Sequence, residues 1–292
     1  MMSSLLLTNT DLRLKEEFRR SYRFTMAGYT RIHEQTTENE FTRELDMEYA
    51  PAADPSGLSF CSFSVHREKM LLDHRSSHLE YIIQAVSSVT QEVHFHLQET
   101  TGTVTLANWN DIRNRWTAVK EKLWNDYKGT EIQRFTEGYD NRMQNKQALT
   151  ASLLQYNLYG LFMNRIHIRY GYTGQQTENR DIVPLFGNTA LPVQELRTVK
   201  NTAEGIKVDI GGNIDENRLD TTAIGHFAYH DLSLAENEDT DLLLQRYSGH
   251  YNLEHDTCIL QKALLQYNIV IGDAWQRKCR FHINTIEPSY NA

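Results

Sequence analysis

Long stretches in which apolar residues alternate with polar ones dominate both ends of this chain. In RSYRFTMAGYTRIHE (20–34) the apolar residues fall mainly at even positions, and in EFTRELDMEYA (40–50) they fall at odd positions. A period of two is typical of a β-strand with one buried face. With the stretch LSFCSFSVHREKMLL, which mixes both faces and is expected to be bulged or buried on both sides, residues 20–72 predict a three-stranded meander.

The C-terminal part of the chain predicts a second meander. Its strands are QRYSGHYNL (245–253), ILQKALLQYNIVIG (259–272) and WQRKCRFHINTI (275–286), with turns at EHDT and GDA between them. In the last of these strands, apolar and polar residues alternate at almost every position. A further strand is expected in GIKVDIGGNID (205–215), where the apolar phase continues through two glycines.

The middle of the chain changes to a helical period. Apolar residues recur at steps of three and four after Asn108, a natural N-cap, and they are Trp109, Ile112, Trp116, Val119, Leu123 and Tyr127. Residues 146–168 are apolar around most of a helical circumference, which predicts a buried helix. Residues 93–106 predict a hairpin, and residues 170–200 are predicted to be rich in loops.

This order of elements predicts the α+β class, with long antiparallel strand meanders at both ends of the chain packed against a central helical segment. We expect two antiparallel sheets that flank or wrap the helices. The chain is accordingly predicted to divide into two regions. Residues 1–170 contain the N-terminal meander, the hairpin and the helices, and residues 171–292 contain the C-terminal meander. The alternative is one layered domain.

Charge and cysteine usage exclude some classes of function. The net charge is −8 and no run of Lys and Arg is long enough to follow a phosphate backbone, so nucleic acid is not an expected partner. The start, MMSSLLLTNTDLRLKEEF, lacks a basic region and a long apolar run, so we expect neither a signal peptide nor membrane insertion. Three cysteines without C-x-x-C spacing favour the cytoplasm.

Histidines provide the candidate metal ligands. In VHFHL (93–97), His94 and His96 share one face of a predicted strand, and His66 and His74 lie in a second histidine-rich stretch, HREKMLLDHRSSH. A zinc site needs three or four ligands, and neither group has a familiar third-ligand spacing. We therefore interpret both as polar surface and assign no metal ligand.

Catalytic and cofactor motifs are also missing from the sequence. GHFAYHD (225–231) and GHYNLEHD (249–256) each contain a His-Asp pair, but no G-x-S-x-G elbow accompanies them. IGGNID does not match G-x-G-x-x-G, and no phosphate-binding loop of the G-x-x-x-x-G-K-[ST] type occurs. We assign no catalytic residue and no cofactor.

Three hypotheses for function remain open. The first is a non-enzymatic interaction protein, such as a cytoplasmic adaptor, chaperone or subunit of a larger assembly, which binds a protein partner or itself. The second is a binder of a small apolar ligand in a cavity between sheet and helices, near the aromatic stripe that starts at Trp109. The third is a metal-dependent hydrolase, which requires His66, His74, His94 and His96 to converge in space.

Overall fold

The structure of the protein is a computed structural model that describes residues 10–287 except 55–56, 74–76, 99, 156–157, 184, 187–188 and 236–239. The first strands are β1 (Thr10–Asp11), β2 (Phe18–Ile32), β3 (Gln35–Ala50), β4 (Ser59–Leu72), β5 (Glu92–Gln98), β6 (Thr103–Leu106) and β7 (Arg169–Tyr170). The later strands are β8 (Gln175–Ile182), β9 (Leu191–Thr202), β10 (Gly205–Ile214), β11 (Leu242–Leu253), β12 (Leu260–Ile271) and β13 (Trp275–Thr285). The helices are α1 (Ser77–Ser88), α2 (Trp109–Asp126), α3 (Thr130–Gln144), α4 (Lys146–Leu153), α5 (Leu158–Phe162) and α6 (Thr221–His226), with short helical turns η1 (Glu216–Arg218) and η2 (Phe227–Asp231).

Eleven strands form one antiparallel sheet in the order β6-β5-β4-β3-β2-β13-β12-β11-β10-β9-β8. The predicted α+β class with long antiparallel meanders is confirmed. The expectation that the two meanders form two antiparallel sheets is wrong, because β2 pairs with β13 from Tyr22–Thr285 to Ile32–Trp275 and so joins the meanders in one sheet. The division into 1–170 and 171–292 stays a prediction.

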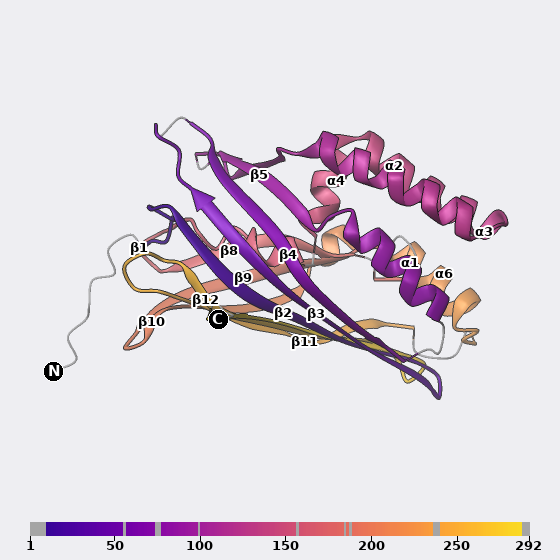
Figure 1. Cartoon of the computed structure of the whole chain (residues 1–292). Helices are drawn as coiled ribbons and strands as arrows, with labels where there is room; N and C mark the ends of the chain where they lie inside the picture. Colours follow the sequence, from indigo (N-terminus) through magenta and orange to yellow (C-terminus); the bar gives the residue numbers. More distant parts are fainter. Residues whose placement is uncertain are drawn as a thin grey trace.

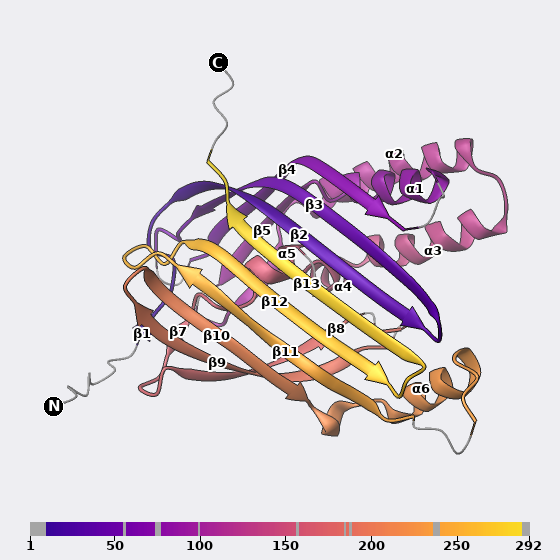
Figure 2. The ribbon, with the colours of Figure 1, turned by 90° about the horizontal axis from the view of Figure 1, so that it is seen from below.

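The sheet curves, and the helices lie on one of its faces (Figure 1). Figure 2 looks at the opposite face, with β2, β13, β12 and β11 side by side in front of α4 and α5. We call the face that carries the helices the inner face and the other the outer face. Most inward positions on the long strands are apolar and buried, including Tyr22, Phe24, Leu45, Met47, Phe63, Tyr251, Tyr267 and Phe281.

The mixed pattern of the third strand has a simple cause. The register between β3 and β4 shifts between Glu44 and Leu45, which is a β-bulge. A bulge adds one residue to one strand, so the residues that follow it point to the other face. Cys61 and Phe63 before the bulge are buried, and after it Glu68 on β4 bonds inward-facing Arg43 at 2.7 Å.

The expectation of a loop-rich segment at 170–200 is wrong, because the segment contains β8 and β9. β8 is an edge strand with the polar sequence QQTENRDI. In β9 the buried apolar residues are Leu191, Val193 and Val199, and the phase is interrupted by Glu195 and Arg197. Those two inward charges hid the strand pattern, and they bond each other in the core.

The buried helix expected at 146–168 is divided into α4 and α5. Asn145 begins α4, because its side chain accepts hydrogen bonds from the backbone nitrogens of Gln147 and Ala148. A Cβ at Gly160 in α5 would lie 1.8 Å from the carbonyl oxygen of Gln155, so only glycine fits this close approach. Both helices are nevertheless buried, as expected, through Leu149, Leu153, Leu158, Leu161 and Phe162.

Asn108 precedes α2 but its side chain makes no capping hydrogen bond there. Its amide instead links to β5, accepting from the backbone nitrogen of His94 at 2.9 Å and donating to the carbonyl of Glu92 at 3.1 Å. The residue therefore fixes the start of α2 against the sheet.

Candidate binding site

An apolar pocket of about 80 Å³ lies on the inner face, near one end of β3 and β4. Strands β3 to β6 provide one wall and the chain that follows α5 provides the other. The apolar residues that line it are Leu14, Met47, Tyr49, Cys61, Leu97, Val104, Phe162, Met163 and Ile168. Cys61 is fully buried and unpaired with another cysteine. Burial raises the pKa of its thiol, so Cys61 contributes a neutral apolar surface.

The polar residues of the pocket are Arg13, Gln98, Arg165 and His167. The side chain of Arg13 is 40% exposed and forms an ion pair of 2.6 Å with Asp11. The side chain of Arg165 is 50% exposed, and its nearest carboxylate is Glu178 at 3.4 Å. Two guanidinium groups thus stand where an apolar pocket meets solvent.

Arg165 has an unusual backbone conformation. Its φ is +50°, in the left-handed region that a residue other than glycine occupies at a cost of about 1–2 kcal/mol. The β5–β6 turn meets it through Gly102, also at positive φ, where a Cβ would lie 3.0 Å from Nε of Arg165. The guanidinium therefore packs directly on the glycine of the turn.

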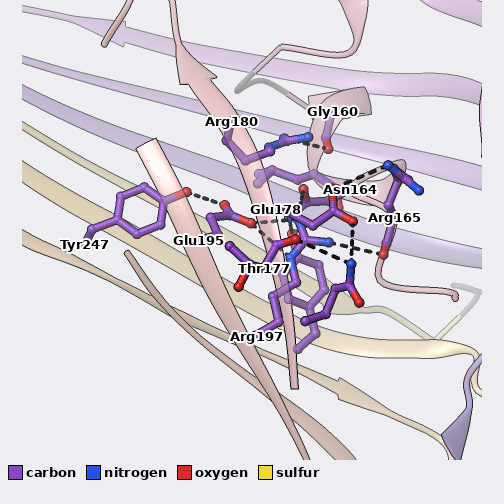
Figure 3. Close-up of polar contacts among 12 residues, drawn as sticks. Gly160, Asn164, Arg165, Thr177, Glu178, Arg180, Glu195, Arg197 and Tyr247 are labelled. Atoms are coloured by element: carbon purple, nitrogen blue, oxygen red, sulfur yellow. Dashed lines mark hydrogen bonds and ion pairs between the residues drawn. The ribbon is translucent and has the colours of Figure 1, made fainter. Parts of the chain in front are cut away.

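A buried polar network holds the backbone of Arg165 in place (Figure 3). Arg197 on β9, with 1% of its surface exposed, donates to the carbonyl of Arg165 at 3.2 Å and to Oδ1 of Asn164 at 3.0 Å. Glu195, fully buried, bonds Nη2 of Arg197 at 2.6 Å. A buried pair of this kind is stable only when its remaining donors and acceptors are also bonded.

Strand β11 completes the network. The hydroxyl of Tyr247 donates to Glu195, and the hydroxyl of Tyr251 accepts from Asn164 at 3.2 Å and donates to the carbonyl of Leu161 at 3.0 Å. Burial raises the pKa of Tyr251 to about 12, so both tyrosines remain neutral donors at neutral pH. The network therefore ties β9 and β11 to the segment that leaves α5.

Arg180 on β8 lies beside this network in Figure 3. Its Nη2 donates to the carbonyl of Gly160 at 3.4 Å, and burial lowers the pKa of its guanidinium. Arg180 thus holds α5 from a second direction, and the wall of the pocket formed after α5 is anchored at both Gly160 and Arg165.

His167 and the N-terminal segment form the remaining side of the pocket. β1 pairs with β7, and the ring of His167 lies 3.2 Å from the carbonyl of Leu12. Burial lowers the pKa of His167 to about 4, so the ring is neutral at pH 7 and Nδ1 donates this bond. Arg13 keeps the pKa of Asp11 well below its usual range, because it bonds that carboxylate through its side chain and backbone.

The histidines singled out in the sequence do not meet at one site. His94 contacts Glu92 at 3.1 Å, His66 contacts Asp46 at 3.0 Å, and the rings of His94 and His96 pack against Phe60. His74 lies outside the described residues. Among the residues that the structure does describe, no group of three or more His, Cys, Asp or Glu side chains could hold a metal ion. This geometry gives the metal-dependent hydrolase no support.

The two Gly-His motifs have different structures. GHFAYHD lies in α6 and η2, where the rings of His226 and His230 are 4.4 Å apart. GHYNLEHD covers the end of β11 and a turn, and its His255 and Asp256 are 3.3 Å apart with both side chains exposed. The aromatic stripe of α2 packs on α3, since Trp116 donates to Asp140 and Trp109 to the carbonyl of Met143.

Arg165, Glu195 and Arg197 were not identified from the sequence. The available signal was the pair of charges at inward positions of β9, at the spacing where the pattern otherwise places Leu191, Val193 and Val199. Charged residues are almost never fully buried unless they are paired. The two charges within the apolar pattern of β9 therefore indicated a buried network. The composition of this segment had instead predicted a loop.

No protein-family model and no curated protein sequence matches the chain. Among solved structures, a lipovitellin structure described by its lipid–protein interactions is similar over 94% of this chain, with 9% sequence identity and a TM-score of 0.43. The chain spans 26% of the length of that lipovitellin chain. DynF from the dynemicin biosynthesis pathway of Micromonospora chersina is similar over 96% of this chain and 87% of its own, with 6% identity and a TM-score of 0.21.

Within the described part of the chain, no helix is both long enough and apolar enough to span a bilayer.

Proposed function

We propose that this protein binds a small amphiphile with a short apolar chain and an anionic group. The observation that carries the proposal is an apolar pocket with two guanidinium groups at its mouth, one of them held by a buried network. The pocket walls would remove the apolar chain from water, and Arg165 would pair with the anion. Charge-assisted bonds to guanidinium are about twice as strong as neutral ones.

The volume of the pocket sets the size of the ligand. A cavity needs roughly 10–15 Å³ to hold one water molecule. The pocket volume of about 80 Å³ therefore accommodates only a few methylene groups. Each methylene removed from water contributes about 0.8 kcal/mol. Burial of four or five of them alone corresponds to a Kd of about 1–5 mM. A charge-assisted bond of about 1.4 kcal/mol lowers the Kd to about 0.1–0.5 mM, and octanoate is a suitable probe.

Isothermal titration of octanoate, with octanol as the uncharged partner of the same chain length, tests this function. We expect octanoate to bind about tenfold more tightly than octanol, because one charge-assisted bond is worth about 1.4 kcal/mol or more. Arg165→Gln should remove most of that difference and leave the binding of octanol unchanged. Equal affinities for the two ligands in the wild-type protein would contradict the role of Arg165.

A pair of variants on β6 locates the binding site. Val104 lines the pocket, whereas Thr105, the next residue along the strand, is exposed. Val104→Trp should fill the pocket and abolish binding, and Thr105→Trp should leave it intact. Circular dichroism of both variants checks that they are folded. If Val104→Trp does not fold, Leu97→Phe fills the pocket with a smaller change in side-chain volume.

A second function, binding to a partner protein as an adaptor, chaperone or assembly subunit, is favoured by a charged groove on the outer face. The groove is separate from the pocket, and the two functions are compatible. A cytoplasmic location is supported by the three cysteines, which are all buried and free. Mass spectrometry of the protein under native conditions, which reports bound partners and retained ligands together, distinguishes the two functions.

A further inference from the structure

The outer face carries a groove of about 750 Å³, lined by residues of β4, β3, β2, β13, β12 and β11. These strands lie side by side in Figure 2. Ala27 and Tyr29 form its floor, at outward positions of β2 that alternate with the inward Phe24 and Met26. Ala27 is paired in register with Glu40 on β3 and Arg280 on β13. The groove is hollow there because a methyl group stands between two long side chains.

The two sides of the groove have opposite charge. The acidic rim consists of Glu38, Glu40 and Asp73, and the basic rim consists of Arg246, Lys278 and Arg280. Tyr29 lies between the rims, with Nζ of Lys278 5.0 Å from the centre of its ring. The groove is therefore polarised across its width, from β3 and β4 to β13 and β11.

Several charges on the outer face form ion pairs, and the rim charges form none with the described residues. Elsewhere on that face Arg19 pairs with Asp46, Arg23 with Glu44 and Lys200 with Asp209, each at 2.7 Å. Within the described part of the chain, none of the six rim residues forms an ion pair. Opposite charges face each other across the hollow without contact, so a ligand with both charges could bind both rims.

We propose that the groove binds an extended segment of a partner protein in which basic and acidic residues alternate. Side chains of an extended chain point alternately to opposite sides. A segment that lies along β2 would direct its basic residues to Glu38 and Glu40, and its acidic residues to Lys278 and Arg280.

The spacing of the rims fits this occupant. Glu38 and Glu40 are two residues apart on β3, and Lys278 and Arg280 are two apart on β13, which gives a repeat of about 6.6–6.8 Å along each rim. An extended peptide repeats its same-side residues at that distance. β3 and β13 both neighbour β2, so the rims are about 10 Å apart, wide enough for one extended chain.

The inference rests on the second of the functions proposed above and is independent of the apolar pocket. Octanoate titrations on the same protein samples distinguish the two, because the pocket is on the inner face. Loss of peptide binding with intact octanoate binding would leave the first proposed function in place.

Fluorescence anisotropy with two labelled octapeptides tests the proposal. The alternating peptide, in which every lysine is followed by a glutamate, presents lysines on one side and glutamates on the other when extended. The block peptide, in which all the lysines precede all the glutamates, has the same composition and net charge but does not. In low salt, about 50 mM, where surface charges are weakly screened, we expect the alternating peptide to bind at least about tenfold more tightly. Equal affinities, or no binding of either peptide, would overturn the proposal.

Variants with matched charge changes locate the peptide. Lys278→Glu should weaken binding of the alternating peptide about tenfold, because it removes an attraction and adds a repulsion. Lys200→Glu, the same change on the outer face away from the groove, should have little effect. If the free protein instead forms a salt-sensitive dimer that Lys278→Glu dissociates, the rims belong to an interface between two copies, and the partner segment proposed here is wrong.

Discussion

The guanidinium of Arg197 donates a hydrogen bond of 3.2 Å to the backbone carbonyl of Arg165, a residue 32 positions earlier in the chain. This bond joins the core of the sheet to the mouth of the apolar pocket. Arg165 has a left-handed backbone, and its side chain lines the pocket. The buried charges therefore have a clear structural role, which is to hold one exposed cation.

Arg197→Met should destabilise the protein strongly. The substitution leaves Glu195 buried without its cationic partner, and removing one member of a buried pair costs about 3–5 kcal/mol. Urea unfolding measures this change in the free energy of unfolding. Lys200→Met on the same strand, which removes an exposed pair with Asp209, should cost less than about 1 kcal/mol. Similar losses of unfolding free energy in both variants would show that the buried pair stabilises the protein no more than an exposed pair does.

Arg165→Gly should separate stability from binding. Glycine adopts positive φ without the penalty of a side chain, so the free energy of unfolding should be unchanged or higher by up to about 1 kcal/mol. Octanoate binding should nevertheless fall, because the guanidinium is gone. A clear loss of stability would mean that the side chain of Arg165 supports the fold rather than the ligand.

Gly102→Ala should lower both the stability of the protein and its affinity for octanoate. The new methyl group would lie 3.0 Å from Nε of Arg165 on a residue with φ of +68°, so we expect a loss of about 1–2 kcal/mol and weaker octanoate binding. Gly138→Ala in α3, where a Cβ meets nothing within 4 Å, should stabilise the protein by about 0.5–1 kcal/mol. Thermal unfolding of both variants provides the comparison.

The pH dependence of stability should include a contribution from His167. Its pKa is lowered from 6.5 to about 4 in the folded protein, so the unfolded chain binds a proton more readily between those values. The free energy of unfolding should therefore fall as pH decreases from about 6.5 to 4, by up to about 3 kcal/mol. Above pH 6.5 this contribution is complete.

His167→Gln isolates that contribution, because the other titrating groups are common to both proteins. The difference in unfolding free energy between wild type and variant should change across this pH range, and urea titrations at pH 7 and pH 4.5 measure it. A constant difference would show that His167 is not buried as described.

The strands with one buried face could be predicted from the sequence. β2, β3 and β13 place their apolar residues at every second position, since one face meets the core and the other meets water. The pairing of β2 with β13 could not be predicted in this way, because no local pattern specifies which strands meet. β8 and β9 were missed because polar side chains cover an edge strand and because Glu195 and Arg197 replace apolar residues in the core.

The site was less predictable than the fold. Arg165 is one arginine among many in the sequence, and its position depends on a left-handed backbone and on bonds from three other elements. His94 and His96, which the sequence offered as candidate metal ligands, lie on the outer face beside Phe60. Local spacing identifies sites whose ligands are close in sequence, and this pocket is assembled from distant segments.

Methionine methyl groups provide the most direct measurement of the central claim. Met47 and Met163 line the pocket, whereas Met143 packs elsewhere in the core, so a protein labelled with ¹³C at its methionine methyls can be titrated with octanoate by NMR. We predict saturable shifts of Met47 and Met163, no shift of Met143, and loss of the shifts in Val104→Trp. Unchanged Met47 and Met163 resonances at millimolar octanoate would contradict binding in this pocket.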